Sequence, residues 1–392
     1  MDHSAKLLLN LFLIYGAAKL LAEIFERLRQ PAVVGEILAG TLLGPSLLGW
    51  VQPGDMLAGL AEIGVIFLLF TVGLETRSGD LLDVGRTAVP VGTVGVLVPF
   101  VLGFFYMEAL GHPQVESVFL AAAMVATSVG ITARVLKDAN VLFTRAARVI
   151  LGAAVLDDIL GMIVLAVVTS LSAGGIKYMQ LAIVAAEAIS FTLLILLFGP
   201  RIVRRLEPAV PGLKSSNPAF VLSILLCLGL SLASVYIGMA AIIGAFLAGL
   251  ALADHSAKWR LHDKVQPVYE FLAPFFFVYL GTQVNVRTLA QRDLLEMVGV
   301  VCLLAIASKL IGCGLASLSM GWKDALRVGV GMVPRGEVGL IVAAVGLSLH
   351  TISDRIYTVV LLMSMITTLV APPLLRLLFP AGTAPVEMAA NE

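Results

Sequence analysis

Apolar runs of about 20 residues recur along this chain, each long enough to cross the hydrocarbon core of a bilayer as a helix. Backbone groups inside a bilayer must be hydrogen-bonded within the protein, which restricts spanning structures to helices and closed barrels. The strict alternation of barrel strands is absent, and only 13% of the residues are charged, against about 25% in soluble domains. The chain is therefore predicted to be an all-α polytopic membrane protein.

Thirteen transmembrane helices are predicted from these runs. They lie at approximately 6–27, 31–49, 56–75, 86–109, 115–138, 145–171, 178–203, 218–236, 238–253, 267–284, 293–318, 322–348 and 354–379. The run at 31–49 is irregular, because Gly40, Gly44 and Pro45 could break it. The N-terminus lacks the pattern of a cleaved signal peptide, so the first run is interpreted as a retained helix.

Basic residues in the loops predict the orientation, because Lys and Arg concentrate on the cytoplasmic side of a membrane protein. The loops and flanks on one side contain Arg27, Arg29, Arg77, Arg86, Lys137, Arg145, Arg148, Arg201, Arg204, Arg205, Lys214, Lys258, Arg260, Lys264, Lys323 and Arg376. Those on the other side contain only Lys6, Lys177, Arg287, Arg292 and Arg355. This asymmetry predicts an N-terminus outside and a C-terminus in the cytoplasm. The expected location is a cytoplasmic membrane of bacterial type.

Three short blocks of the sequence resemble later blocks, at offsets of 208 or 209 residues. The pairs are 34–40 (VGEILAG) with 243–249 (IGAFLAG), 67–73 (FLLFTVG) with 275–281 (FFFVYLG), and 129–131 (VGI) with 338–340 (VGL). This shift carries helix 2 onto helix 9, and an odd shift reverses the orientation in the membrane. Inverted repeats of this kind are typical of secondary transporters, whose sites lie near the midplane where the repeats meet.

The repeat divides the chain into five parts. They are an extra N-terminal helix (1–30), a first repeat of helices 2–6 (31–171), linking helices (172–237), a second repeat of helices 9–13 (238–379) and a short cytoplasmic tail (380–392).

The third pair of blocks falls at the middle of two spans that are rich in helix-loosening residues. These residues are Thr127, Ser128 and Gly130 in the first span, and Gly331, Pro334, Gly336 and Gly339 in the second. Proline lacks the N–H that a helix interior requires. Interrupted helices at equivalent positions of two repeats indicate a transporter's binding site, so two broken helices are expected. The alternative is that these small residues only permit close helix packing.

Two adjacent carboxylates, Asp157 and Asp158, lie halfway along the apolar span 145–171. One Asp at the bilayer centre costs roughly 2.5 to 3.5 kcal/mol, and a purely structural helix gains nothing from two. Adjacent residues project about 100° apart on a helix, so one carboxylate can pair with Lys309, midway along 293–318, while the other faces a water-filled cavity. The pair indicates ion or proton handling.

Other charged residues within the spans are expected to play structural roles. Arg335 and Glu337 should satisfy each other or bridge to neighbouring helices, and Arg134 should anchor its helix end at the membrane interface. Several glutamates are expected to pair with loop arginines or with amides at helix ends. They are Glu36, Glu62, Glu75, Glu187 and Glu270.

Four features of the sequence resemble the NapA-type sodium/proton antiporters of the monovalent cation:proton antiporter family. They are 126–136 (ATSVGITARVL), 151–166 (LGAAVLDDILGMIVLA), Lys309 and 329–344 (GVGMVPRGEVGLIVAA). The resemblance covers essentially the whole chain. It implies a core domain at about 86–171 and 293–379, a dimerisation domain formed mainly by the remainder, a homodimer, and elevator movement of the core.

The resemblance also implies roles for the charged residues. Asp158 would be the main cation ligand, binding Na⁺, and Asp157 would form an ion pair with Lys309. Sodium is a hard cation that should prefer oxygen ligands, including this carboxylate and the Thr127 or Ser128 hydroxyls. A proton and a sodium ion would exclude one another at Asp158, and an unneutralised carboxylate would be costly to carry across the membrane.

The sequence therefore predicts a secondary Na⁺ (or Li⁺)/H⁺ antiporter, not an enzyme, with no cofactor other than the transported ions. If Lys309 or Asp157 carries a second proton, exchange is electrogenic, with two protons per sodium. A K⁺/H⁺ antiporter and a sodium-coupled organic-anion symporter of similar fold are alternatives. A channel is disfavoured because no filter-like loop is evident, and zero net charge argues against a nucleic-acid partner.

Overall fold

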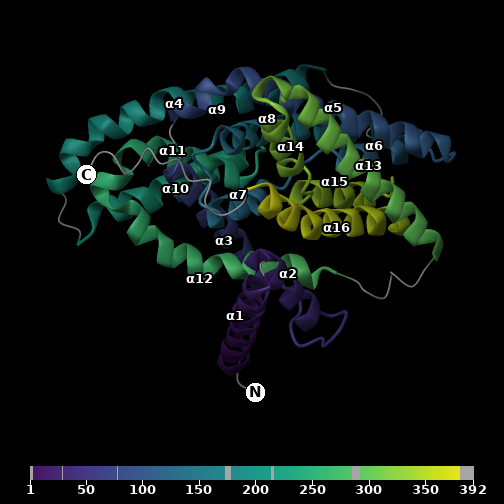
Figure 1. Ribbon diagram of the computed structural model, residues 1–392, viewed down its shortest axis with the longest axis horizontal. Helices are drawn as coiled ribbons and strands as arrows, with labels where there is room; N and C mark the ends of the chain where they lie inside the picture. The colour runs from purple at the N-terminus through teal and green to yellow at the C-terminus, as the bar shows by residue number, and fades with distance from the viewer. Residues whose placement is uncertain are drawn as a thin grey trace.

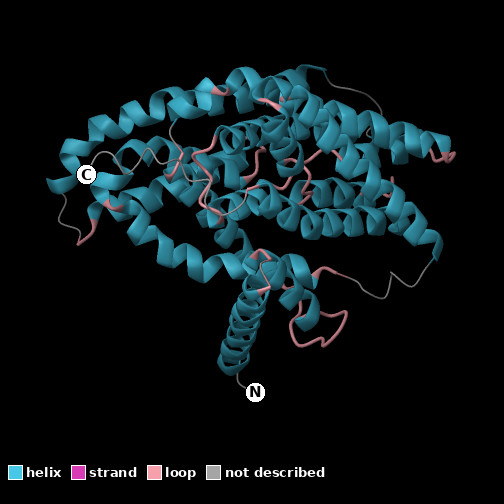
Figure 2. Cartoon of the chain, viewed as in Figure 1, coloured by secondary structure: helices cyan, strands magenta, loops and turns pink. Residues whose placement is uncertain are grey.

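The computed structural model describes residues 3–28, 30–76, 78–172, 178–212, 216–284 and 292–379. Every regular element in these residues is a helix (Figures 1 and 2). The predicted tail at 380–392 and the loop residues Arg29, Arg77, Lys177, Lys214 and Arg287 lie outside the described residues. The all-α prediction is confirmed.

The helices follow the predicted order along the chain. They are α1 (His3–Arg27), α2 (Ala32–Leu43), α3 (Asp55–Leu74), α4 (Ser78–Asp83), α5 (Gly85–Ala109), α6 (Gln114–Ala123), α7 (Val129–Asp138), α8 (Arg145–Ser172), α9 (Tyr178–Leu206), η1 (Glu207–Gly212), α10 (Pro218–Tyr236), α11 (Ala241–Trp259), α12 (Leu261–Thr282), α13 (Arg292–Ala316), η3 (Leu318–Met320), α14 (Trp322–Gly331), α15 (Glu337–Ser348) and α16 (Asp354–Leu378).

Each predicted span corresponds to one helix or to two half-helices. Within the described residues, nine helices are long and apolar enough to cross a membrane, whereas α2, α6 and α15 are shorter. The helix α2 ends at Leu43, earlier than predicted, because Pro45 disfavours helical geometry at Gly44, whose ψ is 178°. The helix α12 begins at Leu261 rather than at 267, so its first turn contains polar residues that the hydropathy pattern excluded.

The helices pack in two groups. In one group, α3 packs against α11 and α12, α2 against α1 and α12, and α11 against α9 and α10. In the other group, α5 packs against α6, α8 and α13, while α16 packs against α13 and α15 (Figure 1). The half-helix α7 contacts α2 and α3 of the first group as well as α8 and α16 of the second. It therefore lies where the two groups meet.

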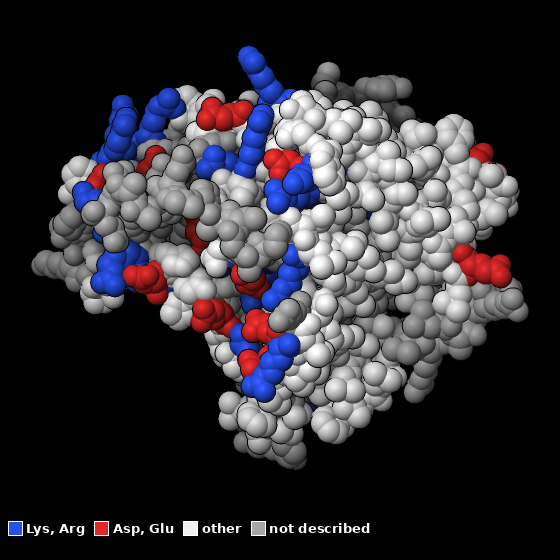
Figure 3. Space-filling view, viewed as in Figure 1, with Lys and Arg blue, Asp and Glu red and all other residues white. Residues whose placement is uncertain are grey.

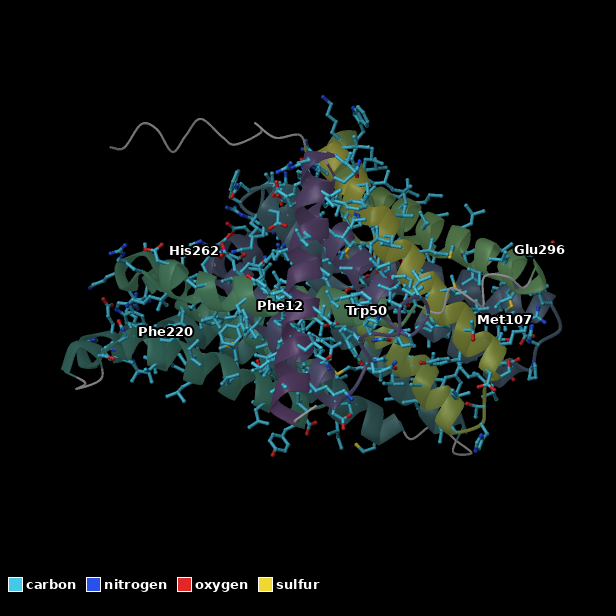
Figure 4. All side chains as sticks on the ribbon, turned by 90° about the horizontal axis from the view of Figure 1, so that it is seen from below. Phe12, Trp50, Met107, Phe220, His262 and Glu296 are labelled. Carbon is cyan, nitrogen blue, oxygen red and sulfur yellow. The ribbon has the colours of Figure 1, made fainter. Side chains whose placement is uncertain are left out.

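Charged side chains are unevenly distributed over the surface. On the face shown in Figure 3 they gather on the left, where α10 and α11 lie, and in a band down the centre, while the right side is mostly uncharged and carries a few acidic residues. Figure 4 places His262 and Phe220 at one end of the molecule, and Met107 and Glu296 at the other. The loop charges also predict that the helix ends near His262 and Phe220 lie on the same side of the membrane, the side that contains most of the Lys and Arg residues.

Glycines from the repeated blocks form two equivalent helix crossings. A Cβ on Gly40 of α2 would lie 2.0 Å from the Val278 carbonyl oxygen of α12, beside Gly281. A Cβ on Gly249 of α11 would lie 2.3 Å from the Phe70 carbonyl oxygen of α3, close to Gly73. The sequence offset thus relates Gly40 to Gly249 and Gly73 to Gly281, so the two crossings are equivalent. Only residues without a side chain allow backbones to approach so closely.

We expect Gly40→Ala to destabilise the α2–α12 crossing, because the added methyl group would meet backbone that cannot move aside. Overpacking of this kind costs typically 1–3 kcal/mol. The matched control is Gly59→Ala on α3, where nothing lies within 4 Å of the added atom. Thermal unfolding in detergent should show a lower midpoint for Gly40→Ala alone. Equal midpoints for the two variants would contradict the crossing.

Candidate functional site

Two helices are interrupted where the sequence predicted. The chain unwinds at 124–128, between α6 and α7, and at 332–336, between α14 and α15. The two interruptions bind each other, since the Ser128 N–H donates to the Pro334 carbonyl oxygen at 2.8 Å. The Thr132 hydroxyl donates to the Gly331 carbonyl oxygen at 2.8 Å. The prediction of two broken, crossing helices is therefore confirmed.

Gly336 permits this close approach. A Cβ at this position would lie 2.5 Å from the Ser128 side chain. The interruptions also leave the last carbonyls of α6 and α14, and the first N–H groups of α7 and α15, without partners inside their helices. Such half-helix ends are the groups that transporters use to meet ions near the midplane.

Arg335 holds the two interruptions together. Its side chain is fully buried, and its guanidinium group donates to the carbonyl oxygens of Val125 and Ala305, each at 3.0 Å. Its own carbonyl oxygen accepts a hydrogen bond from Thr368 at 2.9 Å. Arg335 therefore bridges to α13 and to the first interruption, one of the two arrangements expected. The side chain of Glu337, the first residue of α15, lies outside the described residues.

Asp157 and Lys309 form a buried ion pair. Lys309 Nζ of α13 lies 2.6 Å from Asp157 Oδ1 of α8, and both side chains have zero exposure. The other carboxylate oxygen, Oδ2, accepts a hydrogen bond from the Thr127 N–H at 2.7 Å. Both oxygens of Asp157 are thus engaged, one by a cation and one by the unwound backbone.

Gly95 of α5 makes room for this ion pair. A Cβ there would lie 3.3 Å from Lys309 Nζ and 3.0 Å from Cys313 Sγ. Gly95 was not predicted as a site residue. Its position within the apolar run 86–109 is like that of many glycines, so no local pattern distinguishes it.

Asp158, Thr127 and Ser128 contribute further oxygen atoms in this region. Asp158 follows Asp157 on α8 and is 5% exposed. The Ser128 hydroxyl is buried and makes no hydrogen bond to any described residue. Among the described residues, the Thr127 hydroxyl makes one long contact, 3.4 Å, to the Met332 carbonyl oxygen. A carboxylate, two hydroxyls without a short hydrogen bond to the described residues, and nearby carbonyls are suitable ligands for a small hard cation.

A cavity of about 510 Å³ opens between the two groups of helices, bounded by α3, α10, α11, α12, α15 and α16. Most of its lining is apolar, and its polar side chains include Glu62, Gln283 and Tyr357. A small cavity of about 20 Å³ is lined by Arg335 and Gly336. Both cavities contact Leu280, Gln283 and Leu340, so the larger one adjoins the second interruption.

Arg134 is not the interfacial anchor that we expected. Its side chain is only 10% exposed, lies 3.9 Å from Glu36 of α2, and donates to the hydroxyl of Tyr269 on α12. A charge inside the apolar run 34–40 was the signal that could have identified Glu36 as its partner. Glu75 also pairs with a residue of α7, since Lys137 Nζ lies 2.6 Å away.

The remaining glutamates have less restricted surroundings. Glu62 is exposed and lines the large cavity, and Glu187 is exposed on α9. Glu270 accepts a hydrogen bond from Gln266 one turn earlier on the same helix.

Comparison with known proteins decides the family. The family model described as sodium/hydrogen exchanger, transmembrane, matches residues 13–380. This chain belongs to the sodium/hydrogen exchanger family. The resemblance inferred from the broken helices and the paired carboxylates is confirmed, and this exchanger is an integral membrane protein of a family of transporters, not enzymes.

Similar proteins cover nearly the whole exchanger. The high-affinity Na⁺/H⁺ antiporter NhaS3 of Synechocystis is 35% identical, with 96% of this chain and 90% of that protein aligned. The Na⁺/H⁺-K⁺ antiporter GerN of Bacillus cereus is 34% identical, with 94% and 95% aligned. The structure of the sodium proton antiporter MjNhaP1 from Methanocaldococcus jannaschii has a TM-score of 0.66 and 19% identity, covering 95% of this chain and 98% of that one.

Proposed function

We propose that this protein exchanges Na⁺ or Li⁺ for H⁺ as a secondary antiporter, with Asp158 as the site for which the two ions compete. The observation that carries the proposal is the buried contact set of Asp157. Because Lys309 and the Thr127 N–H engage both oxygens of Asp157, Asp157 is suited to a fixed structural role. We therefore assign the exchange of the proton and the cation to the neighbouring Asp158.

Competition at one carboxylate couples the two fluxes. A proton neutralises Asp158 covalently, whereas a sodium ion neutralises it as a ligand, and the two cannot do so together. The Ser128 hydroxyl, which is buried without a hydrogen bond to the described residues, could complete the oxygen ligands. A carboxylate that carries neither ion is costly to move through a bilayer. Only the loaded or the protonated form should therefore cross readily.

The two groups of helices support an elevator mechanism. We assign α5–α8 and α13–α16 to a moving core, and most of the remainder to a scaffold that forms a homodimer. The interruptions and the ion pair lie within the core, and the large cavity lies between the core and the scaffold. We place the N-terminus outside and the C-terminus in the cytoplasm, because the basic loops lie on one side.

The repeat boundaries can also be refined. A Cβ on Gly35 would lie 2.5 Å from the Leu21 carbonyl oxygen of α1, and one on Gly244 would lie 2.1 Å from the Leu230 carbonyl oxygen of α10. The contact between α1 and α2 thus recurs between α10 and α11, at the same 209-residue offset. This favours six spans in each repeat, with α9 alone as the linker, over five spans and two linkers.

Potassium is the second candidate substrate. The name of GerN includes K⁺ beside Na⁺ and H⁺, and this relative aligns over 94% of the chain. Residue types in the site do not fix the cavity radius or the number of ligands, on which selectivity among monovalent cations depends. The experiment must therefore compare the three cations.

The test is cation-driven proton movement in proteoliposomes that contain a pH-sensitive dye. We expect an outward Na⁺ or Li⁺ gradient to acidify the lumen, and K⁺ to act more weakly. Repeating the assay at clamped zero and non-zero voltage measures the stoichiometry, since two protons per sodium would make exchange voltage-dependent. Cation uptake without proton movement, or only with an organic anion, would overturn antiport. Flux with no obligatory counter-ion would indicate a channel.

A further inference from the structure

A buried polar cluster joins α7 to the scaffold helices. Arg134 of α7 donates from Nε to Asp138 at 2.7 Å and from its guanidinium end to the Tyr269 hydroxyl, and it lies 3.9 Å from Glu36. Its guanidinium carbon also lies 5.2 Å from the centre of the Tyr269 ring. One arginine therefore contacts α2 and α12 at once.

Glu36 is the unusual member of this cluster. Its side chain is 1% exposed, and neither carboxylate oxygen forms a hydrogen bond to a described residue. A buried carboxylate is costly unless it is paired, and at 3.9 Å the Arg134 guanidinium holds it by charge alone. Such an ion pair restrains the two helices and still remains breakable.

A second contact reinforces the first one turn further along α7. Lys137 Nζ lies 2.6 Å from Glu75 Oε1, just past the end of α3, and 5.3 Å from the centre of the Tyr269 ring. His262, at the start of α12, lies 3.2 Å from the same Glu75 oxygen. Arg134 and Lys137 thereby connect the last turns of α7 to α2, α3 and α12.

The other end of the same scaffold helices is open. Glu62 of α3 and Gln283 after α12 line the 510 Å³ cavity that separates the scaffold from α15 and α16. At a rise of 1.5 Å per residue, Glu62 lies about 20 Å along the helix direction from Glu75. The boundary between core and scaffold is thus closed at the α7 end and open at the opposite end.

We propose that Glu36, Arg134 and Tyr269 form a latch that closes the cytoplasmic access route when the opposite route is open. This inference rests on the proposed exchange function, in which the site must open to each side in turn. For the cytoplasmic side to open, α7 must leave α2 and α12, and the Arg134 contacts must break. The latch residues position the core against the scaffold and bind no transported ion themselves.

The latch can be tested by hydrogen–deuterium exchange on the full-length protein in lipid nanodiscs, without sodium. Arg134→Gln and Glu36→Gln should each speed amide exchange in 32–43 and 129–138. The expected factor is on the order of tenfold, corresponding to the loss of one charge-assisted interaction. The double variant should exchange no faster than Arg134→Gln alone, because both substitutions remove the same contact.

The matched control is Arg327→Gln. Arg327 pairs with Asp324 at 2.8 Å and donates to the Leu378 carbonyl oxygen at 3.0 Å, so its contacts stay within α14 and α16. Amide exchange in 32–43 and 129–138 should remain at the wild-type rate in this variant. If Arg134→Gln does not fold, Tyr269→Phe, which removes only the hydroxyl, provides the same comparison.

Unchanged exchange in 129–138 for both Glu36→Gln and Tyr269→Phe would overturn the latch, as would equal acceleration in the Arg327→Gln control. The amide measurement needs no transport. A protein that moves no cation against protons in proteoliposomes would refute the proposed function, whereas unchanged amide rates in an active exchanger would refute only the latch.

Discussion

Asp158→Asn is expected to abolish cation/proton exchange in proteoliposomes. Asparagine has nearly the same shape as aspartate, so the fold should persist, but its amide neither takes up a proton near neutral pH nor supplies a negative charge for a cation. Without the carboxylate, sodium and protons no longer compete for a common binding group. The measurement is dye-reported lumenal pH after a Na⁺ or Li⁺ gradient is imposed.

The control for this variant is Glu187→Gln. Glu187 also lies within a membrane span but is exposed on α9, far along the chain from the broken helices, and its loss should leave most activity. Thermal unfolding should confirm that Asp158→Asn remains folded. Proton movement at the wild-type rate in Asp158→Asn would refute the assignment of this residue.

Lys309→Gln is expected to destabilise the protein strongly, because it removes the cation in direct contact with the buried Asp157 carboxylate. Both side chains have zero exposure and lie 2.6 Å apart. Removal of one partner from a buried ion pair typically costs 3–5 kcal/mol, since the remaining charge is uncompensated. The measurement is the midpoint of thermal unfolding in detergent, which should fall well below that of the wild type.

The double variant Lys309→Gln with Asp157→Asn separates the pair from other effects. Replacing both charges removes the uncompensated carboxylate, so this protein should recover much of the lost stability, and the cycle should show strong coupling. If Lys309 also carries a proton, the charge moved per cation should fall in the double variant. A single variant as stable as the wild type, with unchanged currents, would count against the ion pair.

The sequence predicted much of the site because local chemistry is distinctive inside a membrane. Pro334 and the glycines around it disfavour a regular helix, so an interruption was expected at this position, with close helix packing as the alternative. Asp157, Asp158 and Lys309 stand out because charges are rare in apolar spans. The repeat offset then placed the first interruption, 124–128, opposite the second.

Other features depended on how the helices pack. Gly95 is an ordinary glycine until α13 places Lys309 against it. Arg134 was expected at the membrane interface, since positive charges near helix ends usually lie there. Its neighbours in the sequence give no indication that Tyr269, which is 135 residues away, accepts its hydrogen bond.

By itself, the sequence predicted which segments are helices, where two of them break, and that Asp157, Asp158 and Lys309 lie inside the membrane-spanning part. These features depend on the hydrophobicity and backbone preferences of neighbouring residues. Only the tertiary structure decided that the Thr127 N–H donates to Asp157 and that Glu36 faces Arg134. Pairings of this kind depend on how distant helices cross and rotate, and glycine contacts such as Gly40 with Gly281 set those crossings.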